Sequence, residues 1–385
     1  MSNRSDPPSK GGPRTPAPPS PKAPSPVART PVPPSTRSTT PPTRKNSVSL
    51  RLSTIDFDVV NAARRIVEGS LGLVPGERLV VILDEARRDL GPALVEVTRA
   101  AGGECTVFEL EKVEPRPVRV LPDEIRGALD VAQASILLLG FEEGEQAMRL
   151  TVLELVKTLN LRHAHMVGVT RKSLLAGFSV DPARVVDASR AVRTRLRPDS
   201  RLKLRSASGS NLDITLSPAH RWAEHVGVIR PGRWENLPSG ELMTAPASAE
   251  GVFVADGSIG GSFGAAAGLL TRTPVRFEIV EGVVKRVECS DLALQREVEG
   301  FMRRDLYADH VGTIILGTNI GITAPVGELV CDQNVPGLHL SLGSTFPEKT
   351  GAPNRTRAQL TMTSARADVD LDGAPLIRAG RYMIG

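Results

Sequence analysis

The chain has 385 residues, of which 40% are hydrophobic and only 3% aromatic, and its formal net charge is +5. This length allows two domains with sizeable cores, and no uninterrupted apolar run reaches the roughly 18 residues of a membrane-spanning helix. The three cysteines, Cys105, Cys289 and Cys331, are far apart and odd in number, which argues against a disulfide framework. The N-terminus also lacks the apolar segment of a secretory signal. These features favour a cytoplasmic protein.

Residues 1–48 are expected to form a disordered tail. Pro-Pro, Ser-Pro and Thr-Pro steps recur there, and almost no apolar residue is available to offset the entropy of ordering, so polyproline II character is expected. Residues 1–50 hold eight Lys or Arg and one acid, Asp6, a net charge of +7 (8 − 1), which leaves the remaining chain near −2 (5 − 7). The basic charge therefore belongs to the tail, which argues against a nucleic-acid-binding surface on the folded part. A ligand for a proline-binding module is the alternative interpretation of the tail.

Residues 49–200 are expected to form an α/β domain with a mostly parallel sheet. Runs of apolar, largely β-branched residues predict buried strands over 78–83, 105–110, 134–140 and 164–169. Apolar residues at helical spacing predict helices over 56–68, 87–101, 123–132, 146–159 and 181–196. Strand, helix and strand in succession are typical of βαβ units. Neither G-x-G-x-x-G after a strand nor a phosphate-binding loop motif occurs, so no nucleotide site is predicted.

Residues 201–385 are expected to form an α+β domain with a largely antiparallel sheet. The alternating segments 201–205 and 211–216 flank a Ser/Gly turn, which is typical of a hairpin. Further strands are predicted over 251–255, 275–280, 283–289, 313–316 and 338–342, with a helix over 291–304 and a closing hairpin turn at 369–373. The glycine-rich segment 257–268 lacks a Lys-Ser/Thr pair, which favours a packed tight turn over a phosphate site.

The stretch 236–246, N-L-P-S-G-E-L-M-T-A-P, places one carboxylate, Glu241, directly after a turn. Taken alone, it is a loop with a solvated acid. The stretch nevertheless resembles the N-[LI]-P-[SAT]-G-E signature of the thermophilic metallo-aminopeptidases, the aminopeptidase T or leucyl aminopeptidase type. The segments 255–259 (A-D-G-S-I), 317–322 (G-T-N-I-G-I), 337–343 (G-L-H-L-S-L-G) and 371–373 (L-D-G) extend the resemblance. It covers about residues 55–385 and implies the fold of that family.

The resemblance also implies a centre of two divalent metals, held by two glutamates, two histidines and an aspartate with a tyrosine in support. Such a centre lowers the pKa of a bridging water and polarises the scissile carbonyl. Glu241 and His339 stand at two of these positions. By the same resemblance, the other positions carry Thr313, Phe346, Gln359 and Thr361. One glutamate and one histidine cannot offset the charge of two divalent cations, so no metal and no catalytic residue is expected.

Neighbouring residues could replace part of the missing set. His310 lies three residues before Thr313, and Glu328 and Asp332 lie in the following segment. Within a strand, however, His310 and Thr313 would point to opposite faces. A single weakly held metal on Glu241, His339 and one such recruit is the alternative.

The replacements remove charge but keep shape or hydrogen bonding, which relieves the cost of burying unpaired carboxylates. We therefore expect a non-catalytic peptide-binding protein on a metallo-aminopeptidase scaffold, a pseudoenzyme similar to the peptide-binding proteins of crocagin-type ribosomal-peptide biosynthesis. Its peptide pocket would comprise Glu241, His339, Thr313, Phe346, Gln359 and Thr361. The resemblance implies a homodimer, and neither a nucleic acid nor a membrane is expected as a partner.

Two other functions compete with this hypothesis. A divergent metal-dependent aminopeptidase, with zinc, cobalt or manganese in a rebuilt site, would remove N-terminal residues from peptides. A structural or interaction protein would use the proline-rich tail, with the core as a dimer platform.

Overall fold

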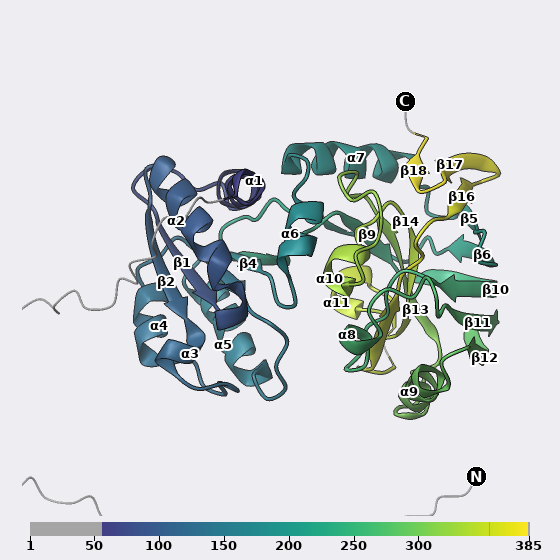
Figure 1. Ribbon diagram of the computed structural model, residues 1–385. Helices are drawn as coiled ribbons and strands as arrows, with labels where there is room; N and C mark the ends of the chain where they lie inside the picture. The colour runs from purple at the N-terminus through teal and green to yellow at the C-terminus, as the bar shows by residue number, and fades with distance from the viewer. Residues whose placement is uncertain (1–55, 354, 384–385) are drawn as a thin grey trace, which may run out of the picture. The chain divides into compact units, whose positions relative to one another are not determined.

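The structure, a computed structural model, describes residues 56–353 and 355–383, and the tail expected over 1–48 lies outside them. Three sheets organise the described chain (Figure 1). In the described part, no helix combines the length and the apolar character needed to cross a membrane.

Sheet A is parallel, with the strand order β2-β1-β3-β4-β8. Its strands are β1 (Arg78–Leu83), β2 (Glu104–Glu109), β3 (Ala134–Leu138), β4 (Arg162–His165) and β8 (Arg233–Asn236). The expected strand over 164–169 is shifted, because pairing with β3 begins at Arg162 and ends at His165. β8 lies beyond the expected domain boundary at residue 200 and yet pairs with β4. Sheet A is therefore completed by a strand from the second half of the chain.

Helices cover both faces of sheet A because the strands are apolar on both sides. Within β1, Val81 and Leu83 belong to the same core cluster as α1 and α2, whereas Val80 and Ile82 belong to the cluster of α4 and α5. The helical segments of this half are α1 (Phe57–Arg64), the π-helix η1 (Arg65–Ser70), the 3₁₀-helix η2 (Glu85–Leu90), α2 (Gly91–Ala100), α3 (Leu110–Val113), α4 (Asp123–Leu129), α5 (Gln146–Thr158), α6 (Arg171–Gly177) and α7 (Pro182–Arg195). The helix expected over 87–101 thus begins as a 3₁₀-helix, and its α-helical part starts at Gly91, followed by Pro92.

Sheets B and C are antiparallel. Sheet B has the order β12-β11-β10-β6-β5-β16-β17-β18, and sheet C the order β15-β14-β13-β9-β7. The strands of sheet B are β5 (Arg201–Arg205), β6 (Asn211–Leu216), β10 (Pro246–Ala255), β11 (Val275–Val280), β12 (Val283–Cys289), β16 (Asp368–Leu371), β17 (Ala374–Arg378) and β18 (Arg381–Tyr382). Those of sheet C are β7 (Ala223–His225), β9 (Glu241–Thr244), β13 (Val311–Gly317), β14 (Gly337–Gly343) and β15 (Gln359–Met362). The hairpins expected at 201–216 and 369–373 are present as β5–β6 and β16–β17.

One hydrophobic cluster joins sheets B and C, and it includes Phe253 and Phe277 of sheet B and Leu316 and Leu340 of sheet C. Four helices of the described chain belong to this half: α8 (Gly264–Ala267), α9 (Leu292–Arg303), α10 (Leu329–Asp332) and α11 (Pro347–Thr350). The expected fold class, an α/β part with a parallel sheet followed by a part with antiparallel sheets, is confirmed.

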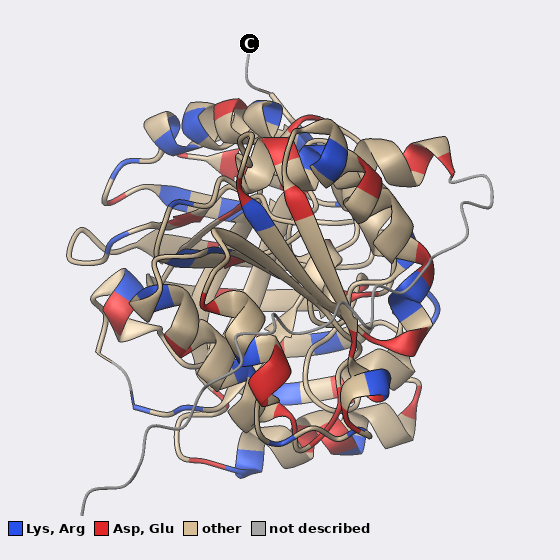
Figure 2. Cartoon of the chain, turned by 90° about the vertical axis from the view of Figure 1, so that its left-hand side faces the viewer, with Lys and Arg blue, Asp and Glu red and all other residues tan. Residues whose placement is uncertain are grey.

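Charged residues are interspersed over the helices and loops, with Lys and Arg close to Asp and Glu (Figure 2). In this view, no large part of the described ribbon carries residues of a single sign. This mixture suits many short-range ion pairs, such as those of Lys203 with Asp213 and of Arg276 with Glu288. Exposed pairs of this kind contribute little to stability.

The cluster between sheets B and C should dominate the stability of this half. Phe277 is fully buried in β11, so Phe277→Ala is expected to lower the free energy of unfolding by about 3–5 kcal/mol through lost burial and the cavity left behind. Leu292→Ala, at a residue that is 62% exposed, is the matched control and should change it by less than about 0.5 kcal/mol. Chemical denaturation measures both, and equal losses would contradict this assignment of the core.

Candidate functional site

The two faces of sheet C differ in chemistry. One face packs into the cluster shared with sheet B and contributes Leu242, Ile314 and Leu340. Glu241 is the register partner of Gly317, and His339 that of Ile315. Thr313 and Thr361 are both register partners of Ser341, and Gln359 pairs with Gly343. Because successive residues of a strand point to opposite faces, five residues of the expected pocket share the second face: Glu241, Thr313, His339, Gln359 and Thr361.

Glu241 is the first residue of strand β9, so the stretch around it is not entirely a loop. The sequence-based interpretation as a solvated acid is wrong, because the Glu241 side chain is only 10% exposed. His225 of β7 is its register partner, and His225 Nδ1 lies 2.6 Å from Glu241 Oε1. Cross-strand pairing therefore places an imidazole directly beside the carboxylate.

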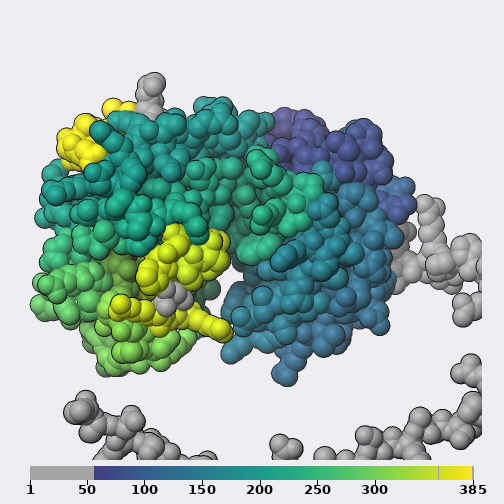
Figure 3. Space-filling model, turned by 180° about the vertical axis from the view of Figure 1, so that it is seen from behind, coloured from purple at the N-terminus to yellow at the C-terminus, as the bar shows by residue number. Residues whose placement is uncertain are grey.

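Lys349 of α11 extends this pair into a chain of three side chains. Its Nζ lies 3.1 Å from His225 Nε2. Since the Lys349 ammonium can only donate, His225 Nε2 accepts and Nδ1 carries the proton that it donates to Glu241. The yellow-green segment that contains α11 reaches the surface seen in Figure 3. The Glu241–His225–Lys349 chain thus runs from a buried carboxylate towards the surface.

Two further groups border this chain. Phe346 precedes α11 in a left-handed backbone conformation (φ 50°), and its ring centroid lies 5.6 Å from Lys349 Nζ. Glu235 of β8 accepts hydrogen bonds from the Gly227 N–H and the Ser239 hydroxyl. Burial raises the pKa of Glu235, and the charge of Glu241 raises it further, whereas those hydrogen bonds and His225 oppose the shift. Glu235 and Glu241 therefore influence each other electrostatically.

The two carboxylate oxygens of Glu241 differ in their hydrogen bonding. Oε1 is engaged by His225, whereas Oε2 is buried and has no hydrogen-bond partner among the described residues. A buried acceptor left unpaired costs about 1–3 kcal/mol, more if it is charged. An incoming donor at Oε2 would recover that free energy.

The ring of His339 is hydrogen-bonded to the backbone and not available to a ligand. Its Nε2 lies 2.9 Å from the Val335 carbonyl oxygen, and its Nδ1 accepts from the Ser364 N–H at 3.2 Å. Complete burial lowers the pKa of His339 to about 4. The ring is therefore neutral at physiological pH, and both of its nitrogens are occupied.

Neutral groups connect the other expected pocket residues. Gln359 Nε2 donates to Thr361 Oγ1 at 3.2 Å, and Thr361 Oγ1 donates to Ser341 Oγ at 3.3 Å. The hydroxyl of Thr313 is buried and has no partner in the described structure. These side chains form a row of hydroxyl and amide groups along the face.

The residues present do not fit a centre of two metals. Within residues 56–353 and 355–383, no three His, Cys, Asp or Glu side chains are grouped so that they could hold a metal ion. The possible recruits have other partners. Glu328 Oε1 accepts from Thr170, Asp332 accepts from the N–H groups of Val326 and Gly327, and His310 lies 2.6 Å from Asp309.

Sequence reasoning missed His225 and Lys349. His225 ends a strand of three residues, and Lys349 lies in a helix of four, so neither element gives a periodic signal. Their relation to Glu241 comes from pairing across the sheet and from the segment between β14 and β15, which one sequence does not reveal.

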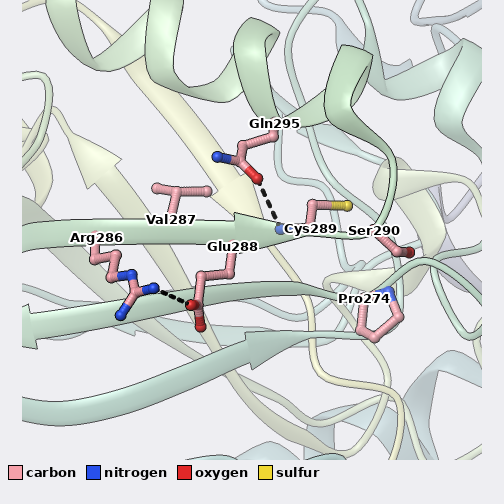
Figure 4. Close-up of a pocket in the computed structure, with 7 residues that line it drawn as sticks. All are labelled: Pro274, Arg286, Val287, Glu288, Cys289, Ser290 and Gln295. Atoms are coloured by element: carbon pink, nitrogen blue, oxygen red, sulfur yellow. Dashed lines mark hydrogen bonds and ion pairs between the residues drawn. The ribbon is translucent and has the colours of Figure 1, made fainter.

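A separate hollow of about 460 Å³ lies at β12 and the start of α9 (Figure 4). Gln295 accepts there from the Cys289 N–H, and Arg286 pairs with Glu288 at 2.7 Å. It contains none of the expected pocket residues and is lined by Pro274, Arg286, Val287, Glu288, Cys289, Ser290 and Gln295.

Buried His339 should make stability depend on acid. Its pKa falls from 6.5 to about 4 on folding, so between these values the unfolded chain is protonated and the native ring is not. Stability is therefore lost as the pH falls through this window, by about 1.4 kcal/mol per pH unit for this one group. His339→Gln should reduce the slope by one proton in denaturation experiments across that range. An unchanged slope would contradict the neutral, buried assignment.

Comparison with known proteins yields structural likeness alone. No family model matches the chain, and no curated protein matches its sequence. The structure of AmpT from Thermus thermophilus matches with a TM-score of 0.60 at 17% identity, covering 85% of this chain and 99% of that one. A 2,5-dihydroxypyridine dioxygenase from Pseudomonas putida KT2440 matches with a TM-score of 0.58 at 18% identity, over 85% and 97% of the two chains. The chain thus has a fold like that of AmpT, which the dioxygenase also shares.

Proposed function

We propose that this protein binds a peptide by its free N-terminus, without cleaving it, on the aminopeptidase-like scaffold. The observation that carries the proposal is the unpartnered, buried Oε2 of Glu241. An α-amino group is a cation with up to three N–H donors, and a carboxylate in a partly desolvated place is its natural acceptor.

The other two members of the Glu241–His225–Lys349 series fix the orientation of the Glu241 carboxylate. Its Oε1 is held by His225, and His225 is held by Lys349, so the carboxylate has a fixed orientation before a ligand arrives. Pre-organised acceptors bind more tightly because little side-chain entropy is lost on binding.

The neutral row beside Glu241 suits a peptide. Thr313, with its unpartnered hydroxyl, together with Gln359 and Thr361, offers hydrogen bonds without charge. Half-buried Phe346 provides an apolar wall next to Lys349. Neutral donors and acceptors bind peptide groups well and divalent cations poorly, which favours capture over hydrolysis.

Binding of a simple peptide tests the role of Glu241. Glu241→Gln keeps the shape and removes the charge, so the affinity for leucyl-glycyl-glycine should weaken by about 1.5–3 kcal/mol. Glu96→Gln, at an exposed residue of α2, is the matched control and should bind like the parent chain. Calorimetry measures all three, and the N-acetylated peptide, which lacks the ammonium, should bind as weakly to the parent as the free peptide binds to Glu241→Gln. Equal binding of free and acetylated peptide would refute recognition through the N-terminus.

A second experiment separates binding from catalysis. The purified chain, supplied with zinc, cobalt or manganese, should not hydrolyse leucine amide above the rate of a blank. Elemental analysis after dialysis accompanies this assay. Two tightly held metal ions per chain together with turnover would establish the metal-dependent aminopeptidase instead.

A further inference from the structure

The carboxyl edge of sheet A carries a second set of polar residues. β2 lies on one side of β1 and β3 on the other, so the strand order reverses direction between β1 and β3. The segments that follow these two neighbouring strands therefore lead away from each other. The helix after β1, α2, belongs to one core cluster, and the helix after β3, α5, belongs to the other. In open α/β sheets, ligands bind in the crevice at such a switch point.

A saturated network of ion pairs holds the two diverging segments together. Asp84, directly after β1, accepts from Arg87, from Arg116 and from the Gly140 N–H. Arg116 also donates to both oxygens of Glu145, which is fully buried. Every anion of this network has cationic or N–H partners, so the network ties the two segments together and leaves no group free to bind.

Arg149, in the first turns of α5, is the exception. Its Nη1 is buried without a hydrogen-bond partner, and its side chain makes no ion pair or hydrogen bond within the described residues. Arg87 and Arg116, in contrast, each pair with carboxylates. The guanidinium lies 5.4 Å from the ring centroid of Phe141, which is 65% exposed. Burial lowers the pKa of Arg149, so its charge is held at a cost.

Aromatic rings lie near Arg149, and the charges of Glu145 and Arg116 act on its pKa in opposite directions, Glu145 raising it and Arg116 lowering it. His165 ends β4, and burial together with the charge of Arg149 lowers its pKa to about 4. This imidazole is therefore neutral. The ring of Trp234, which is 41% exposed, lies 5.6 Å from that of His165. Arg149 is half-buried, and no carboxylate of the described residues contacts it directly, because Arg116 holds both oxygens of the nearby Glu145. Its guanidinium therefore lacks the direct partner that such arginines ordinarily have.

We infer that Arg149 binds the carboxylate of a small ligand whose aromatic body lies against Phe141. The guanidinium fork matches a carboxylate with two parallel hydrogen bonds. A phosphate ligand fits less well, because Glu142 and Glu143 follow Phe141 and are exposed there, and they would repel a second negative charge. This inference does not rest on the peptide binding proposed above.

Phenylacetate is a suitable probe for the full-length chain. Calorimetry should show one molecule bound per chain, and Arg149→Gln should weaken binding about ten- to a hundredfold. Arg149→Lys keeps the charge but not the fork and should lose less. Arg99→Gln, at an exposed residue of α2, is the matched control and should bind like the parent chain. Unchanged affinity in Arg149→Gln, or no binding of phenylacetate or indole-3-acetate at millimolar concentration, would overturn the inference.

Further measurements distinguish carboxylate binding by Arg149 from a role of its charge in the stability of the fold. Phenylacetamide, which lacks the anion, should not bind, and inorganic phosphate should not compete with phenylacetate. Equal binding of the amide, or strong competition by phosphate, would contradict a carboxylate site. Because the guanidinium has an unsatisfied N–H, Arg149→Gln should melt no lower than the parent in the absence of ligand. A melting temperature several degrees lower would show that Arg149 serves stability instead.

Discussion

The two-residue period of sheet C is the constraint on which the second half of the molecule depends. Leu242, Ile314 and Leu340 face sheet B and supply burial, and their immediate neighbours Glu241 and His339 must therefore point the other way. A slip of one residue in any of these strands would place a carboxylate or an imidazole in the hydrophobic cluster. The core thus fixes the orientation of the polar face, and the candidate site needs no separate scaffold.

Much of the fold was predictable because it rests on local patterns. The buried strand at 134–138 and the helix at 146–158 are apolar at the spacings those elements require, and both appear close to their expected bounds. β8 could not be predicted as part of sheet A, because four residues with a mixed pattern do not reveal a partner 71 residues earlier in the chain (233 − 162), as Arg233 pairs with Arg162.

The candidate site was predictable only as a set of positions. Resemblance identified Glu241 and the neutral replacements around it, and the strand register then explains why they share a face. The resemblance could not reveal that both ring nitrogens of His339 are hydrogen-bonded to the backbone, or that His225 lies next to the Glu241 carboxylate. Those facts depend on which short strands pair, and pairing across a sheet is a property of the whole fold. Glu241 and Arg149 share one physical condition, since each has a buried polar atom without a hydrogen-bond partner among residues 56–353 and 355–383.

The membership of β8 in the first sheet bears on how the chain is made. During synthesis, β1 to β4 emerge before β8, and until residue 236 has left the ribosome, β4 is an open edge with unpaired N–H and C=O groups. Such edges are where chains associate wrongly. A fragment ending near residue 200 would keep β4 as an unpaired edge and would be prone to aggregate. In the longer chain, β8 pairs with β4 and becomes the outermost strand, which carries the charged residues Arg233 and Glu235.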